Sequence, residues 1–202
     1  MQSILRPALA LFGALTLVCG IAYPLLVTGI AQAAFPEQAG GSLVKQGDRV
    51  VGSRLIGQHF GSPRYFWGRP SATAPMPNNG GGSSGSNQGP LNPALLDAAR
   101  ARLAALRAAD PDNRAPVPVE LVTASASGLD PEISLAGARW QAGRVARARG
   151  LAPGEVHALI ERHAEGGMAG LSGPARVNVL ALNLALDAAS DVAQDGQTLH
   201  TR

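Results

Sequence analysis

The stretch Pro7–Pro36, PALALFGALTLVCGIAYPLLVTGIAQAAFP, decides how the rest of the chain is organised. It contains no Asp, Glu, Lys, Arg or His. A helix rises about 1.5 Å per residue, so about 20 apolar residues cross the hydrocarbon core of a bilayer. The sequence therefore predicts a transmembrane helix over residues 8–34. We expect a kink at Pro24, because proline removes a backbone donor from the helix.

Glycine occurs three times in this segment, at Gly13, Gly20 and Gly29. Small residues let a second transmembrane helix approach closely. We therefore expect the helix to pack against a partner subunit, with Gly20 and Gly29 as candidate contacts. The alternative is that these glycines face lipid.

A cleaved signal peptide is the alternative to a retained anchor, since Ala31-Gln32-Ala33 fits the small-x-small cleavage pattern. The apolar run is longer than a usual signal-peptide core, which favours the anchor. Arg6 precedes the run and Glu37 follows it. The positive-inside tendency then places residues 1–7 in the cytoplasm and the main domain outside it.

The remaining chain is long enough for one domain with its own core. We expect an α+β fold over residues 35–189, with a small sheet and about four helices, and a polar, frayed tail over 190–202. Cys19 is the only cysteine and lies in the predicted helix, so the domain has no internal disulfide. The net charge is +3, and the arginines are scattered along the chain. They form no basic cluster of the kind that binds nucleic acid.

The expected elements follow from periodicity and from turn residues. Leu43–Val51 reads as a β-hairpin whose second strand continues through Leu55–Gln58, and Val117–Val122 reads as an edge strand. Helices are expected from Asn92-Pro93 to Asp110, from Asp130-Pro131 to Gly150, from Pro153 to Gly166, and over Val177–Leu186, where a strand stays possible.

Three consecutive aromatic residues, Tyr65, Phe66 and Trp67, precede a long segment of Pro, Gly, Asn and Ser without apolar periodicity. One interpretation is a small aromatic core followed by a flexible linker. The other is a subunit interface over Tyr65–Asn87 that becomes ordered only in a complex. Its candidate residues are Tyr65, Phe66, Trp67, Arg69, Ser86 and Asn87.

A second stretch whose residues could bind a ligand is Ser125-Ala126-Ser127-Gly128-Leu129-Asp130. A Ser/Gly turn at a helix N-terminus presents N–H groups to an anion such as a phosphate. Ser125, Ser127, Gly128 and Asp130 are therefore candidates for a nucleotide or anion site. The alternative is that Asp130 merely caps the helix.

Several enzyme signatures are missing from the sequence. It has no Gly-x-x-x-x-Gly-Lys loop and no Asp-Lys-Thr-Gly phosphorylation motif. Its four histidines have neither i,i+4 spacing nor cysteine partners, so we expect no metal site. A Ser-His-Asp triad stays open in principle, but no Gly-x-Ser-x-Gly elbow supports it. We expect a chain without catalytic residues.

Five strings closely resemble the C subunit of the bacterial Kdp potassium-transporting P-type ATPase. They are Gly52-Ser53-x-Leu55-Ile56-Gly57-Gln58, Tyr65-Phe66-Trp67-Gly68-Arg69-Pro70-Ser71, Gly85-Ser86-Asn87-x-Gly89-Pro90, Ser127-Gly128-Leu129-Asp130-Pro131-x-Ile133-Ser134 and Arg176-Val177-Asn178-Val179-Leu180. They occur in the family's order, from the anchor to about Asp187.

This resemblance implies an uncleaved anchor in the bacterial inner membrane. It also implies three partners: a potassium-channel-like subunit, a P-type subunit that hydrolyses ATP, and a small membrane subunit. The chain is then an accessory subunit needed for assembly and coupling. The alternative is a nucleotide-binding catalytic chaperone that raises the ATP affinity of the P-type subunit. ATP is the family's attribution, and we expect no directly bound cofactor.

Overall fold

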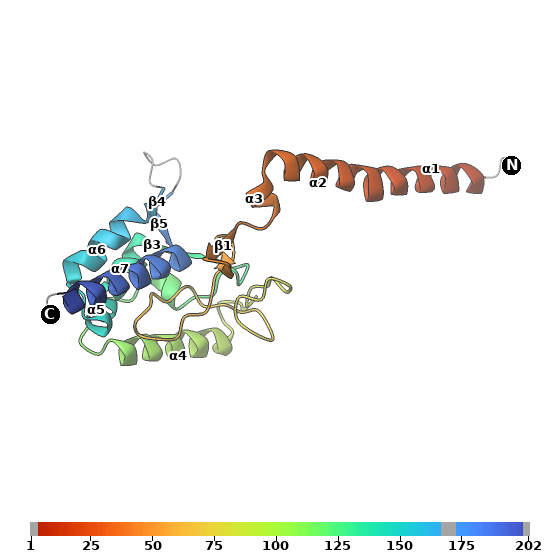
Figure 1. Ribbon diagram of the computed structural model, residues 1–202. Helices are drawn as coiled ribbons and strands as arrows, with labels where there is room; N and C mark the ends of the chain where they lie inside the picture. The colour runs from red at the N-terminus through yellow and green to blue at the C-terminus, as the bar shows by residue number, and fades with distance from the viewer. Residues whose placement is uncertain (1–3, 167–172, 200–202) are drawn as a thin grey trace. The chain divides into compact units, whose positions relative to one another are not determined.

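The computed structural model describes residues 4–166 and 173–199, with side chains described as far as Ser190 (Figure 1). The chain divides into two compact units, Met1–Ser53 and Arg54–Arg202, each held by its own internal contacts. One long N-terminal helix, short antiparallel strands and several further helices make up these units. The predicted α+β class is confirmed.

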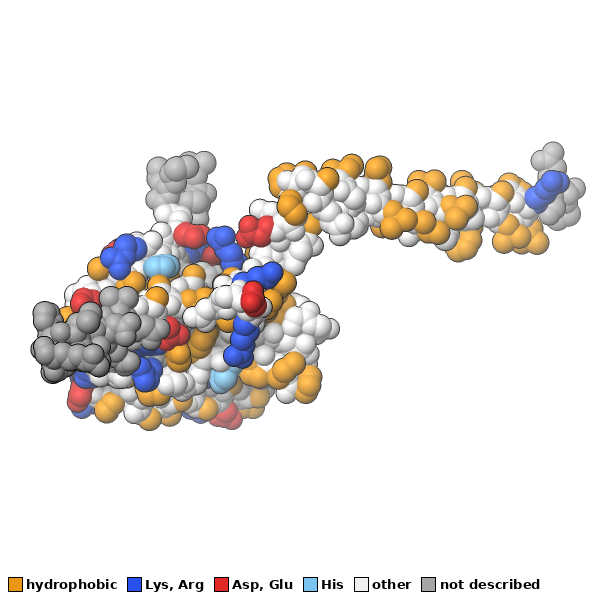
Figure 2. All heavy atoms as spheres, viewed as in Figure 1, with side chains coloured by type: hydrophobic (Ala, Val, Ile, Leu, Met, Phe, Trp, Pro, Cys, Tyr) orange, Lys and Arg blue, Asp and Glu red, His pale blue; other side chains and the backbone are white. Residues whose placement is uncertain are grey.

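The first unit begins with a continuous helical segment over Leu5–Ala34. It consists of α1 (Leu5–Leu17), a single wide π-helical turn η1 (Val18–Ala22) and α2 (Tyr23–Ala34). The Tyr23 N–H bonds to the Val18 carbonyl, five residues back, and the proline that follows has no N–H to donate. None of the side chains in these three elements is buried, and Figure 2 shows apolar groups along the whole segment.

The first unit continues through the short helix α3 (Pro36–Ala39) into a β-hairpin. Strands β1 (Leu43–Gln46) and β2 (Arg49–Ser53) pair antiparallel, with a bulge between Val44 and Lys45. Gly47 adopts a φ of +60° in the turn, which glycine accepts without steric cost. The predicted hairpin is confirmed, but its second strand ends at Ser53, so the predicted continuation through residue 58 is wrong.

The second unit contains a three-stranded antiparallel sheet and most of the core. Strand β5 (Arg176–Asn178) lies between β3 (Glu132–Ser134) and β4 (Ala164–Glu165). Helix α5 (Leu135–Arg149) packs on α6 (Pro153–Arg162), which packs in turn on α7 (Val179–Leu199). The fully buried apolar side chains at the centre include Phe66, Ile133, Val145, Val156, Ile160, Val177, Leu182 and Leu186.

Local signals place several helix ends where the sequence predicted them. Helix α4 (Pro93–Ala109) starts after Asn92, whose side-chain oxygen accepts the Ala94 N–H at 3.0 Å. Helix α5 ends at Gly150, which has a left-handed φ of +68°. Asn178 ends strand β5 and caps α7 by accepting the Ala181 N–H, so both alternatives for this segment hold in part.

Three predicted elements need correction. Val117–Val122 forms no strand, and its centre is the 3₁₀ turn η2 (Val119–Leu121). Asp130 does not open a helix, because residues 132–134 pair with β5 first and Ser134 then caps α5. The helix predicted from Pro153 to Gly166 ends at Arg162, because residues 164–165 pair with β5 as strand β4. In the second case, the pairing of residues 132–134 with β5 outweighed a local proline signal.

Candidate functional site

Two buried amide side chains hold the aromatic segment Tyr65–Trp67. Asn183 of α7 accepts the Phe66 N–H at 2.8 Å and donates to its carbonyl at 3.0 Å. Gln141 of α5 does the same for Trp67, at 2.9 and 3.0 Å. Each amide thus replaces the backbone of a neighbouring strand and satisfies both polar groups of one residue.

Burial divides the three aromatic residues. The Phe66 ring is 0% exposed and sits in the core, where such a side chain contributes about 1.5–3 kcal/mol. The ring of Phe66 therefore packs inside its own chain, and a role of this residue in a subunit interface stays a prediction. Tyr65 and Trp67 remain partly exposed. Their contact with another subunit stays a prediction.

Arginines of α5 cover the two partly exposed rings. The Arg144 guanidinium lies 4.5 Å from the Trp67 ring centre and donates to the Gln141 side chain at 2.7 Å. Burial lowers the pKa of Arg144 to about 10, and the charge of Asp110 opposes this shift. Arg149 lies over the Tyr65 ring at 4.7 Å. The aromatic segment is therefore clamped from within its own chain.

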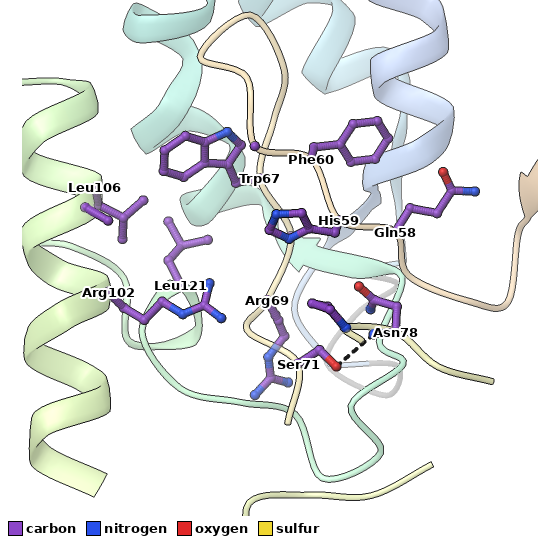
Figure 3. Close-up of a pocket in the computed structure, with 14 residues that line it drawn as sticks. Gln58, His59, Phe60, Trp67, Arg69, Ser71, Asn78, Arg102, Leu106 and Leu121 are labelled. Atoms are coloured by element: carbon purple, nitrogen blue, oxygen red, sulfur yellow. Dashed lines mark hydrogen bonds between the residues drawn. The ribbon is translucent and has the colours of Figure 1, made fainter. Parts of the chain in front are cut away.

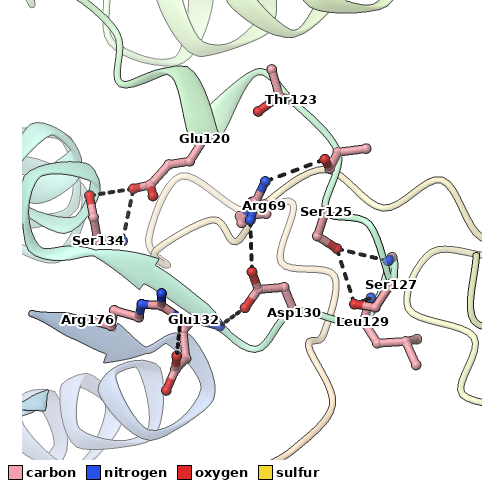
Figure 4. A network of polar contacts seen from close by, with 12 residues as sticks. Arg69, Glu120, Thr123, Ser125, Ser127, Leu129, Asp130, Glu132, Ser134 and Arg176 are labelled. Carbon is pink, nitrogen blue, oxygen red and sulfur yellow. Dashed lines mark hydrogen bonds and ion pairs between the residues drawn. The ribbon is translucent and has the colours of Figure 1, made fainter. Parts of the chain in front are cut away.

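One ion pair joins the two stretches that the sequence singled out separately. Arg69 Nη1 lies 3.0 Å from Asp130 Oδ2, and its Nη2 donates to the Ala124 carbonyl at 3.4 Å (Figure 4). The other Asp130 oxygen accepts the Glu132 N–H at 3.0 Å. The sequence does not reveal this pairing, because its partners lie 61 residues apart. No local pattern connects them.

The glycine- and serine-rich segment folds back onto the same turn. Ser71 Oγ donates to the Gly128 carbonyl at 2.7 Å, and the Ser84 N–H donates to the Ser127 carbonyl at 2.9 Å. Gly128 has a φ of +67°, and a Cβ there would lie 2.6 Å from the Ser84 carbonyl oxygen. Hydrogen bonds within the chain thus hold this segment, and its part in a subunit interface stays a prediction.

Backbone N–H groups of the turn Ser125–Asp130 donate to serine side chains of the same turn. The Gly128 N–H donates to Ser125 Oγ at 2.9 Å, and the Leu129 N–H donates to Ser127 Oγ at 3.1 Å. No helix follows this turn directly, because β3 comes first. The arrangement predicted for a phosphate, in which free N–H groups meet a helix N-terminus, is therefore not present at these residues.

The remaining candidate residues are accessible in their own units. Ser86 and Asn87 are exposed, and Asn87 has a left-handed φ of +50°. Gly20 lies in the π-helical turn and Gly29 in α2, and a Cβ at either would meet no atom within 4 Å. Partner contact at these four positions stays a prediction.

A cavity of about 200 Å³ opens beside the aromatic segment (Figure 3). No local sequence pattern predicts this cavity, since its walls come from segments far apart in the chain. Its lining residues are Gln58, His59, Phe60, Gly61, Trp67, Gly68, Arg69, Ser71, Pro77, Asn78, Arg102, Ala105, Leu106 and Leu121. Within residues 4–166 and 173–199, no three metal-ligating side chains gather into a possible metal site.

An apolar helix of 30 residues, long enough to cross a membrane, followed by an α+β unit is typical of membrane-anchored proteins. A family model described as "KdpC: K+-transporting ATPase, c chain" matches residues 5–188, and the chain belongs to this family. It is thus a subunit of a potassium-transporting ATPase complex, as the resemblance of its motifs predicted.

Curated relatives agree with the family match. A potassium-transporting ATPase KdpC subunit of Herminiimonas arsenicoxydans is 64% identical over 187 residues, which cover 93% of this chain and 98% of the relative. The KdpC subunit of Methylibium petroleiphilum is 66% identical with the same coverage. That of Sorangium cellulosum is 65% identical over 185 residues, or 92% of this chain and 97% of the relative. The similarity thus extends over nearly the whole chain.

Proposed function

We propose that this chain is a non-catalytic accessory subunit that helps the channel-like and P-type subunits of the potassium-transporting ATPase to assemble and couple. The observation that carries this proposal is the 30-residue apolar helix, none of whose side chains is buried by its own chain. Apolar groups exposed over this length need lipid or other apolar helices around them. The helix therefore serves as anchor and as contact.

The middle of this helix is the best candidate for subunit contact. Pro24 has no N–H, so it donates neither to the Gly20 carbonyl four residues back nor to the Cys19 carbonyl five residues back. These carbonyls lie near the centre of the Leu5–Ala34 span, where no water is available to them. A neighbouring helix can approach closely at Gly20 and donate a hydrogen bond there.

The orientation follows from charge. Arg6 lies at the start of the span, so the positive-inside rule predicts that residues 1–7 stay in the cytoplasm. The domain after the span then lies on the other side of the inner membrane. In this arrangement residues 8–34 span the bilayer and residues 35–189 form the extracytoplasmic part, followed by the C-terminal segment 190–202. The small membrane subunit and the channel-like subunit are the partners within reach of such an anchor.

On the extracytoplasmic side, we propose that the accessible parts of Tyr65, Trp67, Arg69, Ser86 and Asn87 contribute to a subunit interface. Internal hydrogen bonds already hold the segment between Ser71 and Ser84. A surface that is ordered before binding loses less conformational entropy on association. The buried amides and arginines in this region support the chain itself, which favours an accessory role over a catalytic one.

The second candidate function is a nucleotide-binding chaperone for the P-type subunit. The basic, aromatic-walled cavity near Trp67 favours it. Two observations place it second. The volume of about 200 Å³ is below the range of about 300–1,000 Å³ typical of sites that enclose a drug-sized ligand. The N–H groups of Gly128 and Leu129 are also occupied within their turn.

The test compares three forms of the chain in cells that express the other subunits. One strain produces the full chain, and a second produces a chain that lacks residues 5–34 but carries a cleavable export signal. A third strain produces no copy of this chain. We expect only the full chain to co-purify with the other subunits and to support growth at low potassium. Full activity with the exported domain alone would contradict the anchoring role. Saturable ATP binding to the isolated full chain would favour the chaperone instead.

A further inference from the structure

The cavity beside Trp67 has an unusual balance of charge. Among its lining residues, Arg69, Arg102 and His59 are basic, and none is Asp or Glu. Figure 3 shows the side chain of Arg102 extending from α4 toward the side where Arg69 and His59 lie. Two permanent positive charges on the walls of one cavity favour an anion inside it.

The two arginines differ in how their charge is balanced. Arg69 pairs with Asp130, but its Nε is buried without a partner among the described residues. Arg102 forms no ion pair with any described carboxylate, unlike Arg100 on the same helix, which pairs with Asp97 at 3.3 Å. The cavity thus retains a net positive charge that no described side chain neutralises.

The rest of the wall has both polar and apolar parts. Ser71 and Asn78 lie at the polar end, where the Asn78 N–H donates to Ser71 Oγ at 2.9 Å (Figure 3). Phe60, Trp67 and Leu106 provide apolar surface. A group that fills this space needs a charged end and a compact apolar body.

We propose that this cavity binds a small organic anion, a carboxylate on a compact apolar group. A volume of about 200 Å³ lies below the range of about 300–1,000 Å³ typical of sites for drug-sized ligands, so the bound group has to be small. The carboxylate faces Arg102 and Arg69, and the apolar body packs on Trp67 and Leu106. The source is either a free organic acid or a carboxylate that a partner subunit inserts.

The experiment uses Trp67 as its own reporter. Trp67 and Trp140 are the chain's two tryptophans, so W140F leaves the cavity residue as the sole tryptophan, which is excited selectively at the long-wavelength edge of its absorption. The full chain in detergent is titrated with benzoate and with benzamide, which has the same shape without the charge. We expect saturable quenching by benzoate and binding of benzamide up to about fivefold weaker, the upper end for one solvent-screened charge contact.

Matched variants test the site on helix α4. R102Q removes the cavity arginine, and R100Q removes a neighbouring arginine that does not line the cavity. We expect R102Q to weaken benzoate binding by about fivefold and R100Q to leave it unchanged, with helical circular dichroism retained in both. Equal binding of benzoate and benzamide, equal effects of the two variants, or no saturable quenching would each overturn the proposal.

The same titration on the assembled complex separates the two sources. If benzoate binds the free chain but not the complex, a carboxylate of a partner subunit occupies the cavity in the complex. Binding to both assigns it to a free organic acid. The titration of the isolated chain does not depend on the proposed accessory function. A negative result there would overturn the anion site and leave the accessory function untouched.

Discussion

The guanidinium of Arg69 lies 3.0 Å from the carboxylate of Asp130, although 61 positions separate the two residues in the sequence. Both side chains are about three-quarters buried, with exposures of 27% and 23%. This pair ties the extended aromatic segment to the turn before β3 and brings two separately predicted sites together.

We expect R69Q to lower the free energy of unfolding of the detergent-solubilised chain by about 1.5–3 kcal/mol, the range for a hydrogen bond to a charged group. Urea titration measures this loss. D130N should cost a similar amount, and the double variant should lose less than the sum of both, because the partners act on each other. R100Q, on an exposed pair, serves as the control. Additive losses would contradict direct coupling.

Replacing either amide that holds the aromatic segment should destabilise the domain strongly. N183L leaves the buried N–H and carbonyl of Phe66 without partners, and each unsatisfied group costs about 1–3 kcal/mol. We therefore expect a loss of at least about 2 kcal/mol in thermal or urea unfolding. Q46L changes an exposed amide in β1 and should have little effect. Similar stability of both variants would show that the amide contacts contribute nothing.

Gly128 has a conformation that other residues rarely adopt, and it lies against the folded-back segment. We expect G128A to cost about 1–3 kcal/mol, since its left-handed φ is unfavourable for alanine. Its new Cβ would also meet the Ser84 carbonyl oxygen at 2.6 Å, so limited proteolysis should detect loosening of residues 71–84. G89A, with no atom within 4 Å of the added carbon, is the control. Unchanged protease resistance would contradict the role of this contact.

Replacing Gly20 should weaken assembly without unfolding the second unit, Arg54–Arg202. A leucine at this position blocks close approach by a neighbouring helix. We expect G20L to reduce co-purification of the other subunits several-fold, while the size-matched change A14L leaves it nearly intact. G29L tests the second glycine in the same assay. Normal assembly after replacement of Gly13, Gly20 and Gly29 together would refute packing through these positions.

The proposed orientation is testable with a single cysteine. Cys19 is the only native one, so C19A provides a background free of thiols. Leu91 is 95% exposed, and L91C places a reactive thiol on the surface of the second unit. We expect a membrane-impermeant maleimide to label L91C in spheroplasts prepared from intact cells. Labelling that appears only after membrane disruption would place this domain in the cytoplasm.

The sequence by itself determined the features that depend on neighbouring residues. An uncharged run of apolar residues suffices to specify the long helix, because helical hydrogen bonds form within a few positions. Asn92 and Gly150 set helix ends in the same local way. The family could also be predicted from short strings of residues, and the match over residues 5–188 confirms it.

Only the tertiary structure decided how the aromatic segment and the Ser125–Asp130 turn come together. Asn183 and Gln141 reach Phe66 and Trp67 across 117 and 74 positions, and nothing in the local pattern around either amide identifies its partner. The same holds for Asp130, where the sequence predicted a helix cap and the fold formed an ion pair with Arg69. Buried polar groups bond to whatever the packed core brings within reach, so their partners are decided by the arrangement of the elements and not by spacing along the chain.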